Sequence, residues 1–111
     1  MKDEPVEAIF EATVGQAIDE TLSALGESPK QAIYSHLKIV YGISKEDIPN
    51  KIEAFASALE QTFGSVAKLI EIKIIEKLHS QHEDFRYTPK SGKLDFIEYI
   101  TDLQNRLEQK A

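Results

Sequence analysis

The segment Gly64–Leu78, GSVAKLIEIKIIEKL, most constrains the fold because aliphatic residues recur on two sides of the helix it predicts. At helical spacing, residues 66, 70 and 74 form one stripe and residues 69, 72 and 75 form another. A helix that is apolar around most of its circumference belongs in the interior. We therefore expect this helix to be the central and most enclosed element. Its interleaved charged residues are expected to pack their aliphatic stems and keep their charged heads in water: Lys68, Glu71, Lys73, Glu76 and Lys77.

The length and composition favour one globular domain. A chain of 111 residues matches the usual size of a single domain, and 41% hydrophobic residues can build one core. The regular apolar periodicity argues against disorder. Because the chain has no cysteine, it excludes a disulfide, a zinc–thiolate site and a thiol nucleophile.

The charge pattern bears on location and partners. No apolar run approaches the ~18–20 residues that span a bilayer, and the start MKDEPVEAIFEA lacks the basic and apolar regions of a secretory signal. The sequence therefore predicts a cytoplasmic protein with no membrane partner. The net charge is −6, and residues 1–26 hold one lysine against six carboxylates. Such a surface repels a phosphate backbone, so nucleic acid is an unlikely partner.

The first two predicted helices form a hairpin. The first is expected from Glu4 to Leu25, with Asp3 as its N-cap and Gly26 as a left-handed stop. The second is expected to begin at a capping box, Ser28-Pro29-Lys30-Gln31, and to end at Gly42. Its apolar stripe comprises Ile33, Leu37, Val40 and Tyr41.

The rest of the chain predicts three more helices. A short connector over residues 43–50 should anchor Ile43 and Ile48 in the core, and Pro49 disfavours helix there. Helices follow over 51–63, ending at Gly64, and from the cap Ser65 to residue 78. Residues 79–93 are expected to form a loop, and residues 94–109 a last helix. The predicted fold is all-α: an antiparallel four-helix bundle, residues 4–78, with an additional C-terminal helix.

The last helix carries the candidate interface. Its apolar residues are spaced four, three and four apart, as in a coiled-coil seam: Phe96, Ile100, Leu103 and Leu107. Four helices can close a core by themselves, so this seam is available to a protein partner or to a homodimer. Intramolecular packing onto the bundle is the alternative. A groove beside the helix at 66–78 is a second place for a partner.

Two clusters are candidates for metal ligands. Glu46, Asp47 and Asn50 place oxygen ligands for calcium in one connector, although the EF-hand pattern is absent and helix capping also explains Asp47. His79 and His82, three residues apart, fit zinc but lack the four strictly spaced ligands of a structural site. Metal ions are therefore possible ligands, and the sequence indicates no cofactor.

Catalysis and DNA binding have weaker signals. None of the three histidines has the context of a nucleophile or triad, and the five glycines are dispersed rather than gathered in a phosphate loop, so we expect no enzyme. Residues 32–59 resemble a helix-turn-helix in outline. However, the start of its second helix offers two carboxylates and a proline to base edges, with only Lys45 and Lys51 in support.

Residues 15–80 resemble a group of small archaeal helical domains that occur alone or as output modules of response regulators. The resemblance rests on these segments: Leu25-Gly26, Ala32-Ile33-Tyr34-x-x-Leu37, Tyr41-Gly42-Ile43, Asp47-Ile48-Pro49, Phe55-x-x-x-Leu59 and Phe63-Gly64-x-x-Ala67-x-x-Ile70-Glu71. These positions are caps, turns and core residues. The resemblance therefore implies a shared fold and an archaeal regulatory setting, and it carries over no catalytic residue.

Overall fold

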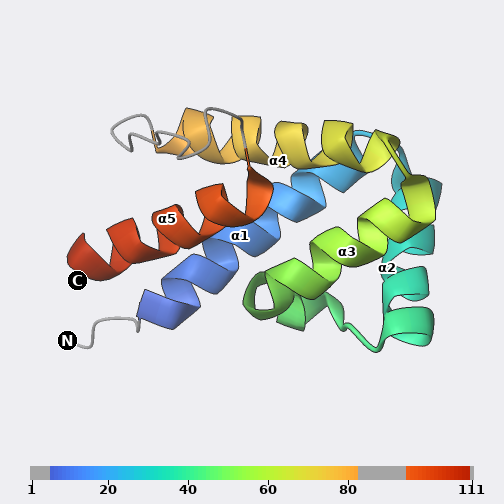
Figure 1. The fold of residues 1–111 in the computed structure, drawn as a ribbon, viewed down its shortest axis with the longest axis horizontal. Helices are drawn as coiled ribbons and strands as arrows, with labels where there is room; N and C mark the ends of the chain where they lie inside the picture. Colours follow the sequence, from blue (N-terminus) through green and yellow to red (C-terminus); the bar gives the residue numbers. More distant parts are fainter. Residues whose placement is uncertain (1–5, 83–94, 111) are drawn as a thin grey trace.

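The computed structural model describes residues 6–82 and 95–110, which form α-helices joined by short turns and one 3-10 helix (Figure 1). The elements in chain order are α1 Val6–Ser23, α2 Glu27–Tyr41, η1 Lys45–Lys51, α3 Ile52–Phe63, α4 Val66–Gln81 and α5 Phe96–Lys110. No strand occurs in these residues. The all-α class is therefore confirmed. Within the same ranges, no helix is both long and apolar enough to cross a membrane.

The central element is α1, which packs against α2, η1, α4 and α5. Its inner face is fully buried and includes Phe10, Val14 and Ile18. The prediction that the helix at 66–78 is the most enclosed was wrong: on α4, Val66 and Leu69 keep 50% and 59% of their surface exposed. In a domain this small, only one helix can have neighbours on every side, and the others leave one flank in solvent.

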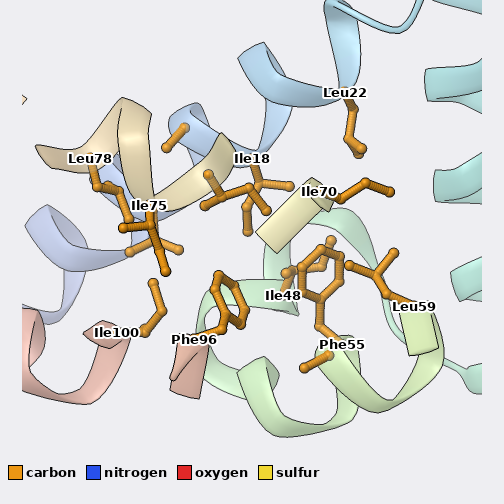
Figure 2. Packing of buried hydrophobic residues seen from close by; sticks show 14 of the residues in the cluster. Ile18, Leu22, Ile48, Phe55, Leu59, Ile70, Ile75, Leu78, Phe96 and Ile100 are labelled. Atoms are coloured by element: carbon orange, nitrogen blue, oxygen red, sulfur yellow. The ribbon is translucent and has the colours of Figure 1, made fainter. Parts of the chain in front are cut away.

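The core lies where the helices converge on α1. Ile18 of α1 lies toward Ile75 of α4 and Leu22 of α1 toward Ile70 of α4, while Phe55 of α3 packs against Phe96 of α5 (Figure 2). The two phenyl rings lie 6.4 Å apart between centroids with an angle of 49° between their planes. Side chains from α1, η1, α3, α4 and α5 thus form one continuous cluster, which makes α5 part of the domain core.

Helix α2 lies apart from this arrangement. Helices α1, α3, α4 and α5 run lengthwise through the molecule, whereas α2 runs across them at one end (Figure 1). It packs mainly against α1 and, less extensively, against α3, and it buries only Ile33 and Leu37. The finer prediction of an antiparallel four-helix bundle is therefore not confirmed.

The boundary between α1 and α2 corrects a sequence-based detail. Helix α1 ends at Ser23, and Gly26 serves as the N-cap of α2 with φ 118° and ψ 154°, outside the left-handed helical region. Helix α2 starts at Glu27, and no side chain caps it, so the predicted capping box at residues 28–31 was wrong. Instead, the Gln31 amide donates to the Glu27 carboxylate over 2.8 Å. The predicted cap Asp3 lies outside the described residues.

The connector and the last two helices depart from prediction at their ends. Ile43 and Ile48 are buried, as predicted, but residues 45–51 form a 3-10 helix that contains Pro49. Pro49 disfavours the α-helical conformation at Ile48, and the segment forms the 3-10 type instead. Helix α4 continues to Gln81, three residues into the predicted loop, whose residues 83–93 lie outside the described part. Helix α5 begins where the Asp95 carboxylate accepts a hydrogen bond from the backbone N–H of Glu98 at 2.9 Å.

Candidate functional site

An apolar groove of about 550 Å³ lies between α2, α3 and the start of α4. We call it the α2–α3–α4 groove. Its lining consists of Leu25, Pro29, Ala32, Ile33, His36, Leu37, Ala58, Leu59, Thr62, Phe63, Val66 and Ile70. None of these residues is a lysine, an arginine or a carboxylic acid. The volume falls within the ~300–1,000 Å³ usual for binding sites, and the lining is typical of one.

Small side chains and the crossing of α2 create the groove. Helix α2 runs across one end of the molecule instead of lying along α3 (Figure 1). The two helices therefore contact each other only to a limited extent. On the α2 wall, Pro29 and Ala32 are short, and on the α3 wall Ala58 and Thr62 are short. At the rim, Leu25 and Val66 remain about half exposed. Exposed aliphatic side chains around an apolar hollow are a feature of many interaction sites.

The outer face of α2 continues this apolar surface as a ridge. Ile39 and Val40 expose 81% and 57% of their surface, which corrects the prediction that Val40 belongs to the buried stripe of its helix. Helical spacing places Val40 four residues beyond His36, so ridge and groove share one side of α2. The side chains of this stripe are therefore short near the N-terminus of α2 (Pro29 and Ala32) and larger near its C-terminus (Ile39 and Val40).

His36 lies between the groove and the ridge. Its ring contacts Tyr41 edge-on, with centroids 5.7 Å apart and an angle of 69° between the planes. The Tyr41 hydroxyl donates to the Gln61 side-chain oxygen of α3 at 3.1 Å. This hydrogen bond links the C-terminal end of α2 to α3.

A charged cluster fastens α2 to α1 on the side away from the groove. The Tyr34 hydroxyl donates to Asp19 of α1 over 2.9 Å, while the ammonium groups of Lys30 and Lys45 lie 3.8 and 3.4 Å from the same carboxylate. Lys45 also lies over the Tyr34 ring, 5.1 Å from its centroid. Burial and the hydrogen bond to Asp19 raise the pKa of Tyr34 above its usual range. Burial alone would raise the pKa of Asp19, but the Tyr34 hydroxyl and the two lysines lower it below its ordinary value.

Glu71 of α4 is the exception among the charged residues of that helix. Only 3% of its surface is exposed, and its Oε2 has no hydrogen-bond partner among the described residues. Burial raises the pKa of the Glu71 carboxyl, and the nearby carboxylates of Glu60 and Asp95 add to this effect, whereas Lys68 opposes it. The prediction that this head group lies in water was wrong. The carboxyl lies near Glu60 of α3 and Asp95 at the start of α5, and Glu71 does not line the groove.

The predicted seam of α5 lies inside the chain. Phe96, Ile100 and Leu103 are buried in the core cluster, and Leu107 packs against it with part of its surface exposed (Figure 2). Helix α5 contacts α1, α3 and α4. This is the intramolecular alternative that the sequence left open. The three buried residues are not available to a partner in this conformation.

The structure does not bring the predicted metal ligands together. Glu46, Asp47 and Asn50 lie on η1, and the Asn50 amide donates to Glu11 of α1 at 2.6 Å. His79 is exposed on α4, and His82 Nδ1 lies 3.1 Å from the backbone oxygen of Leu78. Across residues 6–82 and 95–110, no group of three or more histidine, aspartate or glutamate side chains is placed to hold a metal ion.

The two lysines suggested for DNA binding both lie on η1. Lys45 pairs with Asp19, as described above, and Lys51 ends η1. Helix α3, the second helix of the supposed motif, presents Phe55 and Leu59 to the core.

Comparisons of the chain with protein-family models, curated proteins and solved structures find no match. Function must therefore be argued from the site. The sequence did anticipate a groove beside the helix at 66–78, but not its other wall. That wall includes Pro29 and Ala32 of α2, and the signal for it in the sequence was the shortness of these two side chains.

Proposed function

We propose that this protein is a non-enzymatic interaction module that binds an amphipathic helix of a protein partner in the α2–α3–α4 groove. The observation that supports this proposal is the groove itself: about 550 Å³, open to solvent, and lined without a single lysine, arginine or carboxylate. Recognition of a helix in a groove depends on apolar anchors at positions i, i+3 or i+4, and i+7. The regulatory setting implied by the archaeal resemblance is compatible with such a role and forms part of the proposal.

The apolar lining of the groove and the net charge of the protein favour a partner helix with apolar anchors and a basic outer face. An apolar lining provides no ion pair for a charged anchor, and burying an unpaired charge there is costly. The anchors of the partner helix should therefore be leucine, isoleucine, valine or phenylalanine. The protein as a whole carries a charge of −6, so lysine or arginine on the outer face of the partner helix would speed its approach.

The test is a titration with a synthetic helical peptide of about 18 residues, with leucine at the anchor positions and glutamine and lysine elsewhere. The amide resonances of the labelled protein report where it binds. We expect saturable shifts at Ala32, His36, Thr62 and Val66. Ala32→Trp fills the groove with an indole and should weaken binding at least tenfold.

The matched control is Ala54→Trp, which adds the same side chain at an exposed position of α3 outside the groove. Its affinity should equal that of the unmodified protein. No shifts at the groove, or equal weakening by both substitutions, would refute the proposed function.

A further inference from the structure

We infer that one occupant of the groove is a second copy of this chain, bound through a two-fold contact between the α2 helices. This inference rests on the proposed function, because it uses the same groove. It deepens that function by naming the partner.

The shape of α2 is self-complementary. Along its solvent side, the short side chains of Pro29 and Ala32 line the groove, and Ile39 and Val40 project farther along the helix. His36, which also lines the groove, lies between these two pairs. If two α2 helices meet antiparallel about an axis at His36, Val40 of each copy lies opposite Ala32 of the other. A large side chain then fills the space left by a small one at two symmetric places.

Two-fold symmetry requires such a surface. In an isologous interface, one patch must complement itself, so a hollow and a projection of similar size must lie at equal distances from the axis. A parallel pairing would place the two ridges against each other and leave the two hollows empty. The size gradient along α2 therefore favours the antiparallel arrangement.

The charges permit the contact. Each copy carries −6, and two such chains repel each other over most of their surface. The stripe formed by Pro29, Ala32, His36, Ile39 and Val40 has no carboxylate, and the nearest acidic residue on α2, Glu27, is directed elsewhere by its hydrogen bond from Gln31 and its ion pair with Lys30. The contact therefore opposes no like charges from this stripe. Added salt should leave the dimer unchanged or strengthen it by screening the remaining surface.

The available area predicts a weak dimer. Helix α2 has 15 residues and is therefore about 22 Å long. Together with the neighbouring wall of the groove, α2 presents a face about two helix diameters wide in each copy, or about 20 Å. The face measures roughly 440 Å² per copy, below the ~800 Å² per partner of a standard stable interface. Association should therefore depend on concentration, with dissociation in the micromolar range or weaker. Such a dimer can yield its groove to another helix.

The deciding experiment is sedimentation equilibrium of the full chain over a wide concentration range, at low and high salt. We expect a monomer–dimer equilibrium that does not weaken with salt. Ile39→Asp should raise the dissociation constant at least tenfold, because it places a carboxylate on the ridge. At this exposed position it should leave the melting temperature close to that of the unmodified protein. Ala32→Trp should have the same effect on the dimer by filling the hollow.

The matched control is Ile72→Asp, which adds the same charge at an exposed aliphatic residue of α4 outside the groove and should leave the dissociation constant within twofold. A monomer at every concentration, or a dimer insensitive to Ile39→Asp and Ala32→Trp, would overturn the inference. The peptide titration separates the two ideas. A monomer that still binds the peptide refutes only the dimer, whereas a chain that neither dimerises nor binds the peptide refutes the proposed function as well.

Discussion

Replacing the buried carboxyl of α4 should stabilise this protein. In Glu71→Met, a side chain of similar length replaces a glutamate that is only 3% exposed and whose Oε2 has no hydrogen-bond partner among the described residues. An unsatisfied buried polar group costs about 1–3 kcal/mol. Exchange of a buried charge for an apolar side chain of similar volume is commonly neutral or stabilising. We therefore expect the free energy of unfolding to rise by about 1–3 kcal/mol near neutral pH.

The pH dependence gives this prediction its sign. Burial and the neighbouring carboxylates raise the pKa of Glu71 in the folded state above its value in the unfolded chain. As pH rises from the unfolded value through the folded one, the folded state holds more protons, so the unmodified protein loses stability over that interval. The advantage of Glu71→Met should therefore be smallest below the ordinary glutamate pKa, increase with pH, and level off above the raised pKa.

The assay is urea unfolding followed by circular dichroism at several pH values between about 4 and 8, which brackets the ordinary glutamate pKa. A gain of 1–3 kcal/mol corresponds to a rise in melting temperature of roughly 4–12 °C for a domain of this size. The control is Glu76→Met, which removes an exposed carboxylate of the same helix and should change stability by less than about 0.5 kcal/mol. A loss of stability in Glu71→Met at pH 8, or a difference independent of pH, would refute the reasoning.

Three further predictions concern packing and charge. Leu103→Ala removes a fully buried side chain of α5 and should cost about 2–5 kcal/mol in urea unfolding. Leu107→Ala, at a partly buried position, should cost less, and equal effects would contradict the packing of α5. Gly15→Ala should increase the free energy of unfolding by about 0.5–1 kcal/mol and so raise the melting temperature. The added methyl would lie 3.8 Å from Pro49, an ordinary contact, and a loss of stability would show that the helix cannot accommodate it. Asp19→Asn should cost about 1 kcal/mol at pH 7. Because the folded pKa of Asp19 is lowered, this difference should vanish as pH falls through that pKa, and a constant difference would contradict the role of its charge.

Short-range patterns in the sequence predict much of the helical structure without reference to tertiary contacts. The apolar spacing and the glycines at 42 and 64 predicted the helices to within a few residues in most places. At Gly42, the left-handed conformation with φ 68° lets the N–H groups of Gly42 and Ile43 reach the carbonyl groups of Lys38 and Leu37, respectively, which ends α2 as the sequence indicated. The burial of Ile43 and Ile48 followed from the same local pattern.

The incorrect predictions concern features that depend on the packing of the whole domain. Helix α4 is apolar around most of its circumference, so its sequence did not determine which arc would face the core. The contacts with α1, α3 and α5 selected an arc that includes Glu71 and excludes Leu69. The capping box failed for a related reason, since the turn geometry at Gly26 allowed α2 to begin one residue before Ser28.

The sequence by itself determined that the chain is all-helical and where most of its helices end, because caps, glycine turns and apolar periodicity act over a few neighbouring residues. Only the tertiary structure decided that α1 is central, that the seam of α5 is buried within the chain, and that α2 stands apart and opens a groove. These outcomes depend on which helix faces compete for the same limited core. That competition is settled by contacts between residues far apart in the chain, such as Ile18 with Ile75 and Phe55 with Phe96.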